Sequence, residues 1–432
     1  MIMKYLINSI AVVITFHISV HAQNENIPLK QYVKEADKLS KNKSVQLAMD
    51  AIDDFEEQTI ADMILLTEIP APPFKETKRA KKFREMLETI GVDSAWIDTE
   101  GNVLALRKGK KGNKTIVLDA HMDTVFQEET NVTVKREGNT YVAPGIGDNT
   151  RGMAMVLTVL KAMNKAEVET QENVVFVGTV GEEGLGDLRG VKHLFSDASD
   201  IKIGSWISID GGSSGRIING ALGSKRYKAV FKGKGGHSWG SFGLANPHHA
   251  MGEAISLFVK EATKYTDKDG LKTSFNIGRI GGGTSVNSVP FESWMEVDMR
   301  SLDPKRLIKI DTIFKISMRE AVRSYNASGV KDKISMDLVP IGDRPSGQLP
   351  IHTSLIQRAL AASTFLGIKP KLKTGSTNSN IPIAKGIPAT TLSRGGKGRD
   401  AHSLSEKWTN IDGAKNIKLV LMVTLMEAGI YK

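Results

Sequence analysis

The sequence predicts an α/β protein in which helices cover a largely parallel β-sheet and a smaller α+β domain is inserted into the chain. Two observations support this fold class. Between residues 115 and 210, short apolar runs alternate with helical segments, as the crossover connections of a parallel sheet require. Between residues 221 and 342 the order becomes β-α-β-β-α-β, which is typical of a small two-layer domain. The pattern expected of a parallel sheet covered by helices returns in residues 343–432. Residues 23–220 and 343–432 are therefore expected to form one domain, with residues 221–342 inserted into it.

Length and composition agree with this division. A chain of 432 residues is too long for one ordinary core. The net charge is +10, but the lysines lie in short scattered groups without interleaved aromatic residues. We therefore expect a solvated basic surface and no nucleic-acid partner. Cysteine is absent from the sequence, so no disulfide framework or lipid-attachment site is expected.

Residues 1–22 have the pattern of a secretory signal peptide. Lys4 precedes a mostly apolar run, and Val20-His21-Ala22 puts small residues where a signal peptidase cleaves. The run is short and polar for a stable membrane span. We expect cleavage before Gln23 and export to the periplasm or the exterior, with no membrane attachment after cleavage. An uncleaved anchor is the alternative.

The expected elements follow from apolar periodicity and from turn residues. After a polar leader at residues 23–43, the first half predicts helices at 45–69, 80–90, 151–164 and 187–195, and strands at 95–98, 103–107, 115–121, 173–180 and 205–210. The insert predicts strands at 227–232, 275–280, 294–300 and 333–339, with helices at 246–263 and 304–325. The last part predicts helices at 353–366 and 411–428, and strands at 369–373 and 389–393.

Polar residues that can bind metal follow several of these strands. His121-x-Asp123 ends the strand at 115–121, Glu182-Glu183 follows the next strand, and Asp210-Gly211 follows the third. Asp148 precedes a helix, and His402 follows a glycine-rich turn. Each residue alone also fits an ordinary role, such as a helix cap, an acidic turn or a surface pair. Because the carboxyl ends of parallel strands meet at one edge of the sheet, the whole set indicates one converging site.

These motifs, in this order, resemble those of the dizinc exopeptidase and amidohydrolase family that includes peptidase T, carboxypeptidase G, carnosinases and aminoacylases. The resemblance covers essentially the whole chain after the signal segment. It is nearest to peptidase T (tripeptide aminopeptidase), in which the ligand at the position of Asp210 is aspartate. It implies a zinc-exopeptidase type of fold, with the insert as a lid and dimerisation domain.

The resemblance also implies the roles of the site residues. Two divalent ions per chain, zinc with cobalt or manganese as alternatives, would share Asp148. His121 and Asp210 would complete one metal site, and Glu183 and His402 the other. Asp123 would orient His121, and Glu182 would be the general base.

The insert carries further expected site residues. His237, in a glycine-rich turn, would reach the other subunit's site in a homodimer and stabilise the oxyanion. Asn287 and Arg300 match positions that hold the substrate's carboxylate or scissile carbonyl. The 375–378 loop matches a substrate-side loop, but its last residue is Asn378, where relatives often have Asp.

We therefore expect a secreted metallopeptidase that cleaves a terminal bond of small peptides, most simply an aminopeptidase of di- and tripeptides. A carboxypeptidase or an N-acyl-amino-acid amidohydrolase is the alternative, since Arg300 and Arg394 offer positive charge for a terminal carboxylate. A non-catalytic protein that binds metal or peptide is a third hypothesis.

Overall fold

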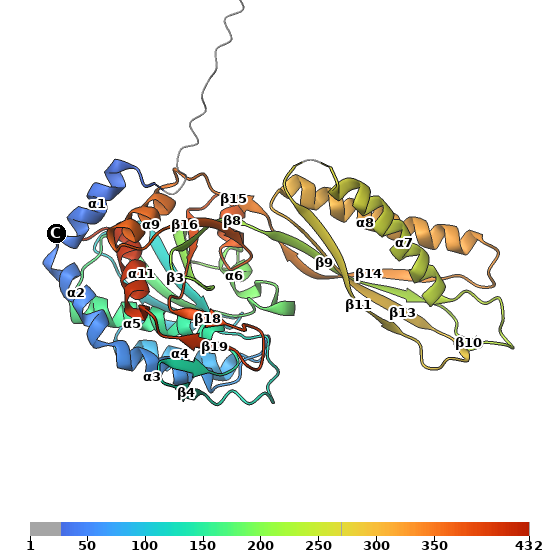
Figure 1. The fold of residues 1–432 in the computed structure, drawn as a ribbon, viewed down its shortest axis with the longest axis horizontal. Helices are drawn as coiled ribbons and strands as arrows, with labels where there is room; N and C mark the ends of the chain where they lie inside the picture. The colour runs from blue at the N-terminus through green and yellow to red at the C-terminus, as the bar shows by residue number, and fades with distance from the viewer. Residues whose placement is uncertain (1–26, 269, 432) are drawn as a thin grey trace, which may run out of the picture.

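The computed structural model describes residues 27–268 and 270–431, which form a larger α/β part and an elongated smaller part (Figure 1). The predicted signal peptide lies outside the described residues. None of the helices within the described ranges combines the length and the hydropathy needed to cross a membrane.

The larger part is built on a nine-stranded sheet with the order β1-β2-β6-β3-β7-β17-β8-β15, in which β16 also pairs with β8. Its strands are β1 (Ser94–Ile97), β2 (Val103–Arg107), β3 (Thr115–His121), β6 (Asn173–Thr179), β7 (Ile203–Ile209), β8 (Arg216–Ala221), β15 (Gly347–Gln348), β16 (Lys371–Gly375) and β17 (Ala389–Leu392). The four central strands β6, β3, β7 and β17 are parallel. The flanking pairs β1–β2, β2–β6, β17–β8 and β8–β15 are antiparallel, so the sheet is mixed.

Both faces of this sheet are covered. One core joins the sheet to α1 (Lys30–Ser40), α2 (Lys43–Asp54), α4 (Thr77–Ile90), α5 (Arg151–Lys165), α9 (Ser354–Phe365) and α11 (Gly413–Ala428). The opposite core contains α6 (Arg189–Leu194) and α10 (Asn380–Ala384). Strand β3 is apolar at successive positions because both of its faces are buried. Ile116 and Leu118 pack in the first core and Val117 packs in the second.

Two local differences from the expected elements have physical reasons. The predicted polar leader contains α1, whose apolar stripe is short: only Ala36 and Leu39 are buried. Packing against α9 stabilises this helix. Because most residues of α1 are polar, apolar periodicity did not predict it. The predicted helix at 45–69 is two helices, α2 and α3 (Glu56–Thr67), which meet at the non-helical residue Phe55.

A second, four-stranded sheet with the order β18-β19-β5-β4 was not predicted. Its strands are β4 (Lys135–Glu137), β5 (Thr140–Val142), β18 (Lys397–Arg399) and β19 (Lys407–Thr409). Each has only three residues, which is too short for alternation to be recognised. This sheet brings the segment around His402 next to the segment before Asp148.

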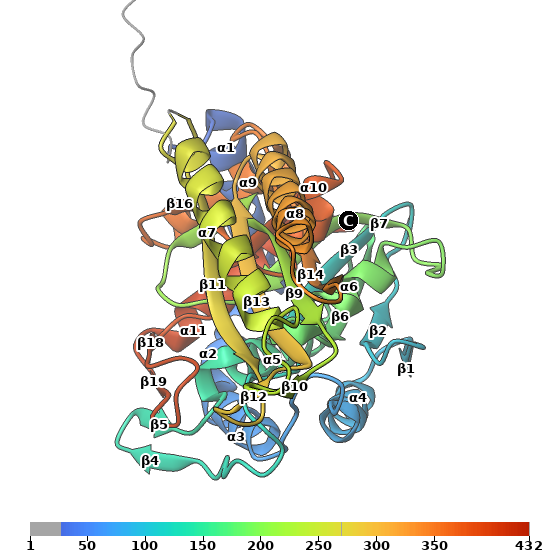
Figure 2. The ribbon, with the colours of Figure 1, turned by 90° about the vertical axis from the view of Figure 1, so that its right-hand side faces the viewer.

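The smaller part has the predicted β-α-β-β-α-β order. Its antiparallel sheet β11-β13-β9-β14 is formed by β9 (Gly223–Lys232), β11 (Thr273–Gly282), β13 (Glu292–Ser301) and β14 (Ser335–Arg344). Helices α7 (Pro247–Thr266) and α8 (Pro304–Ala327) lie side by side on one face of this sheet (Figure 2). Asn246 and Asp303 cap these helices, each followed by the proline that the sequence places at the first turn. We call this part the lid domain.

The lid domain is joined to the larger part at one place. Strand β8 continues into β9 through Leu222, and β14 returns through residues 345–346 to β15. Ser224 lies opposite Arg344 in the lid sheet, and Ala221 lies opposite Gly347 in the large sheet. The two crossings are therefore adjacent, and side chains at this junction are close to the large sheet.

Candidate metal centre

The expected metal ligands meet at the carboxyl edge of the parallel strands. His121 is the last residue of β3, Asp210 follows β7, and the Glu182-Glu183 pair follows β6. These strands are neighbours and parallel, so their ends lie side by side. His121 and both glutamates are buried.

Asp148 comes from a short irregular turn, Ile146–Thr150, that leads into α5. A buried glutamate fixes this turn: the carboxylate of Glu406 accepts the main-chain N–H groups of Gly145 at 3.1 Å, Gly147 at 3.0 Å and Asp148 at 2.8 Å. Burial, followed by the Asp148 charge, raises the pKa of Glu406. Glu406 was not predicted from the sequence, although it lies only four residues after His402.

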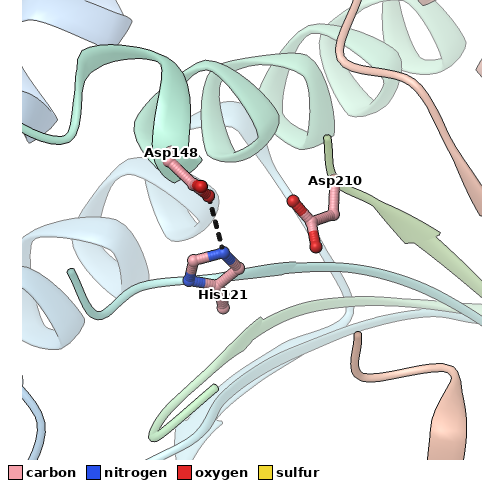
Figure 3. A group of neighbouring side chains, drawn as sticks. All are labelled: His121, Asp148 and Asp210. Carbon is pink, nitrogen blue, oxygen red and sulfur yellow. Dashed lines mark hydrogen bonds and ion pairs between the residues drawn. The ribbon is translucent and has the colours of Figure 1, made fainter. Parts of the chain in front are cut away.

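The side chains form two ligand groups that share Asp148. In the first group, Asp148 Oδ1 lies 3.2 Å from His121 Nε2, and Asp210 lies beside this pair (Figure 3). In the second group, His402 Nε2 lies 3.0 Å from Glu183 Oε1 and 3.5 Å from Asp148 Oδ2. The ligand atoms within each group lie within 4.8 Å of one another. Imidazole nitrogen and carboxylate oxygen in this arrangement fit two divalent ions bridged by one carboxylate.

His121 is oriented by the main chain as well as by a carboxylate. Its Nδ1 lies 3.0 Å from the carbonyl oxygen of Asp123 and 3.7 Å from Asp123 Oδ1. If Nδ1 carries the proton, it donates to that carbonyl and leaves Nε2 free as a ligand. Burial lowers the pKa of His121, but Asp123 and Asp148 together raise it well above its ordinary value.

The carboxylate of Asp123 supports the paired glutamates. Its two oxygens accept the main-chain N–H of Glu182 at 3.0 Å and that of Glu183 at 2.7 Å. Burial raises the pKa of Asp123, but His121 and these two N–H groups lower it below its ordinary value overall. Asp123 therefore stays ionised and fixes both glutamates relative to His121.

Glu182 is held by an arginine from the junction with the lid domain. Arg344 Nη1 donates to Glu182 Oε1 at 3.0 Å and to Ser376 Oγ at 3.0 Å, and Nη2 donates to the Glu182 carbonyl. Burial raises the pKa of Glu182 well above its ordinary value, although Arg344 opposes this effect. Arg344 was not predicted from the sequence, because it lies beyond the expected strand at 333–339 and belongs to no recognised motif.

A pocket of about 370 Å³ connects these groups. Its lining residues come from both parts of the chain: Val125, Asp148, Glu182, Glu183, Gly184, Asp210, Arg226, Arg300, Arg344, Ser376 and His402. Arg226 Nε and Arg300 Nε each donate to one oxygen of Asp298, at 2.8 Å and 2.7 Å. Arg226 Nη1 also donates to the Gly184 carbonyl at 3.4 Å, and both lid arginines line the pocket.

Two expected site residues lie elsewhere in this chain. His237 pairs with Ser288 in the short β10–β12 ladder at the far end of the lid domain (Figure 1), where β10 is Gly236–His237 and β12 is Ser288–Val289. Asn287 is adjacent and accepts the N–H of Ser238 at 2.9 Å through its carbonyl. Both are exposed, and neither lines the pocket among the residues that the structure describes.

Asn378 is buried against strand β3 and does not line the described pocket. Its side-chain amide donates to Asp119 Oδ2 at 2.7 Å and to Thr179 Oγ1 at 2.6 Å. Burial raises the pKa of Asp119 to about 6, although hydrogen bonds from Ser208, Asn378 and Thr179 lower it. Asparagine at this position therefore satisfies a buried carboxylate of β3, and Ser376 is the residue of the 375–378 loop that lines the pocket.

Most of the chain matches one protein-family model. The model described as Peptidase family M20/M25/M40 matches residues 117–424, which include every ligand residue named above. Uncharacterized protein YqjE of Bacillus subtilis (strain 168) is 25% identical over 385 residues, which cover 85% of this chain and 98% of YqjE.

Solved structures share the fold. Aminopeptidase PepT from Bacillus cereus ATCC 10987 has a TM-score of 0.66 at 20% identity, covering 86% of this chain and 99% of PepT. The Bacillus subtilis YXEP protein, a dinuclear metal-binding peptidase, has a TM-score of 0.61 at 20% identity, covering 87% of this chain and 99% of YXEP.

Proposed function

The chain belongs to peptidase family M20/M25/M40 and is a metal-dependent hydrolase, and on this premise we propose that it is an exported two-zinc aminopeptidase of di- and tripeptides. The observation that carries this proposal is one small pocket that is lined by members of two ligand groups sharing Asp148, with Glu182 beside them. A pocket of about 370 Å³ suits a short peptide better than a protein chain.

The ligand groups fit the ions that the family implies. The group of His121, Asp148 and Asp210 would hold one ion, and the group of Asp148, Glu183 and His402 the other. Two bound divalent ions would polarise the scissile carbonyl and lower the pKa of the attacking water. We propose zinc as the native metal, with cobalt and manganese as alternatives, and elemental analysis of the purified protein tests this assignment.

The protein's own groups then perform the proton transfers. Glu182 takes a proton from the attacking water and delivers it to the leaving amine. The N–H···Oδ bonds to Asp123 fix the main chain of Glu182, and Arg344 fixes its carboxylate. The raised pKa of Glu182 makes its carboxylate a stronger proton acceptor than an ordinary glutamate.

The pocket arginines favour a second candidate function. A free α-amine needs an acidic partner, and the carboxylates that line the described pocket all belong to the ligand groups or to the base. Arg226 and Arg300 instead offer positive charge for a terminal carboxylate. A carboxypeptidase or an N-acyl-amino-acid amidohydrolase would use this charge directly, whereas an aminopeptidase of short peptides would use it for the far end of the substrate.

One substrate panel separates these functions. Turnover is compared on a free tripeptide, its N-acetyl derivative and its C-terminal amide. Loss of turnover on acetylation alone supports the aminopeptidase, and loss on amidation alone supports the second candidate. For an aminopeptidase, Arg300→Gln should raise KM for the free tripeptide but not for the amide. For the second candidate, which does not turn over the amide, it should raise KM for the free tripeptide. Arg279→Gln is the matched control, because Arg279 pairs with Glu296 on the lid and does not line the pocket.

The third hypothesis from the sequence, a non-catalytic protein that binds metal or peptide, disagrees with membership of a hydrolase family. Glu182→Ala distinguishes it, because this change should abolish hydrolysis by an enzyme and leave peptide binding intact. If the unmutated protein and this variant show the same background rate, the hydrolase assignment fails.

We also propose a homodimer in which His237 completes the partner's site. The position of His237 at the exposed end of the lid is consistent with this role. Mixing inactive Glu182→Gln protein with inactive His237→Ala protein tests it. Random exchange of subunits should restore about one quarter of the normal activity, because half of the dimers regain one intact site. No recovery, or a fully active monomer, contradicts the proposal.

Export is proposed from the pattern of residues 1–22. Expression of the full chain, followed by cell fractionation and N-terminal sequencing, should give an exported protein that begins at Gln23. A cytoplasmic protein that keeps Met1 contradicts this proposal.

A further inference from the structure

A buried arginine faces only one of the two ligand groups. Arg394 follows β17, and its side chain is only 5% exposed. Its Nη1 donates to Asp148 Oδ1 at 2.9 Å and lies 3.7 Å from Asp210 Oδ1. Asp148 Oδ1 is also the oxygen that lies 3.2 Å from His121 Nε2. The guanidinium therefore lies beside the first group, where a divalent ion would be held.

The second group lacks such a cation. Its members Glu183 and His402 interact with each other and with Asp148, and no arginine or lysine forms an ion pair with either of them within the described residues. Arg344 contacts the neighbouring Glu182 instead. Apart from the shared Asp148, only the first group therefore has a buried arginine beside its own carboxylate, Asp210, within the described residues.

The position of Arg394 argues against a role in substrate binding. Arg394 is absent from the described lining of the pocket. The main-chain N–H of Arg394 donates to the carbonyl of Gly211 at 3.2 Å, and this bond holds Arg394 next to the segment that contains Asp210. Without this charge, the carboxylates of Asp148 and Asp210, each 15% exposed, would repel each other in metal-free protein. Arg394 instead attracts both.

We propose that Arg394 is a resident counter-cation of the His121, Asp148 and Asp210 group. It stabilises this group in the metal-free protein and weakens its affinity for a divalent ion. The group of Asp148, Glu183 and His402 consequently loads first and holds its ion more tightly. This inference rests on the two-ion function proposed above.

The test is a titration of metal-free protein with Mn²⁺ by calorimetry, combined with thermal unfolding before and after loading. The unmutated protein should bind two ions in separate steps, and His121→Gln should remove the weaker step. Arg394→Met should tighten the weaker step by about 10- to 100-fold, the usual scale of changes next to metal ligands, and leave the tighter step unchanged. It should also lower the melting temperature of the metal-free protein and increase the rise that metal produces.

Two further variants control for damage to the fold. Arg394→Lys keeps the charge and should retain separate steps even if the methionine variant folds poorly. Arg358→Met removes another largely buried arginine, which pairs with Glu35 at 2.9 Å and with Glu427 at 2.6 Å and contacts no ligand carboxylate among the described residues. It should lower stability without changing either affinity.

The outcomes separate the two proposals. If Arg394→Met leaves the weaker step unchanged or weakens it, or if Arg394→Lys merges the steps, the counter-cation role is wrong. If the unmutated protein binds fewer than two ions per chain, the two-ion function itself fails.

Discussion

Replacing Asp123 by asparagine should weaken the metal centre without unfolding the protein. The carboxylate of Asp123 uses one oxygen for the N–H of Glu182 and the other for the N–H of Glu183. Asparagine keeps one acceptor oxygen and turns an NH2 group toward the second N–H. One buried main-chain donor is then left without a partner, which costs about 1–3 kcal/mol of unfolding free energy.

The same change should reduce metal affinity. The main-chain carbonyl of Asp123, which lies 3.0 Å from His121 Nδ1, is unchanged in the variant. The effect should therefore fall mainly on Glu183 and its partner His402. A change behind a ligand typically reduces affinity by about 10- to 100-fold, which corresponds to about 1.4–2.8 kcal/mol.

The assay is denaturant unfolding of metal-free protein together with a Mn²⁺ titration. Asp98→Asn is the matched control, because the Asp98 carboxylate also accepts main-chain N–H groups, from Glu100, Gly101 and Asn102, but lies in a turn away from the ligands. It should lower the free energy of unfolding and leave metal affinity unchanged. If Asp123→Asn also leaves affinity within about twofold, the link from Asp123 to the ligands is refuted.

Three further predictions concern the same pocket. Glu182→Gln should lower kcat by about 10²- to 10⁴-fold with metal content unchanged in elemental analysis, and loss of metal would contradict a role confined to proton transfer. The pKa of His402 is raised from 6.5 to about 10 by Asp148 and Glu183, so its stabilising effect on the metal-free protein is complete below about pH 6.5 and is lost as the pH rises through about 10. Thermal unfolding should show this decline, and the same decline in His402→Gln would contradict it. Arg344→Met should lower the free energy of unfolding by about 3–5 kcal/mol, because it leaves the Glu182 carboxylate buried without its partner. Arg344→Lys should recover part of this loss, and equal losses in urea unfolding would show that the charge is not what matters.

The sequence predicted the parts of the fold that depend on apolar periodicity. The β3 run is buried on both faces, and β13 alternates buried and half-buried residues, so both patterns were visible. Helix α1 and the three-residue strands were missed because packing across distant segments stabilises them. The expectation of a largely parallel sheet holds for the four central strands, whereas the antiparallel flanking strands depend on pairings that local sequence does not encode.

The candidate site divides in the same way. Residues that follow strands, such as His121 and Asp210, were identified because strand ends converge on one edge of a sheet. The residues that were missed or misplaced act across long sequence separations. Arg344 contacts Glu182 across 162 positions, and Glu406 contacts Asp148 across 258. No local motif marks such a contact. The sequence indicated that Arg394 could bind the substrate's carboxylate, whereas in the structure its guanidinium donates to Asp148.

The adjacent crossings between the two parts of the chain affect how the large sheet can assemble. Strands β15, β16 and β17 follow the lid in sequence but pair with β7 and β8, which precede it. Closing a flexible loop of about 120 residues would cost about 4 kcal/mol of chain entropy. The lid domain has an apolar core of its own, and its Ser224–Arg344 pairing brings the two crossings together. If the lid domain folds early, it therefore brings the ends of the two flanking segments together. The C-terminal strands then lie close to the edge of the large sheet with which they pair.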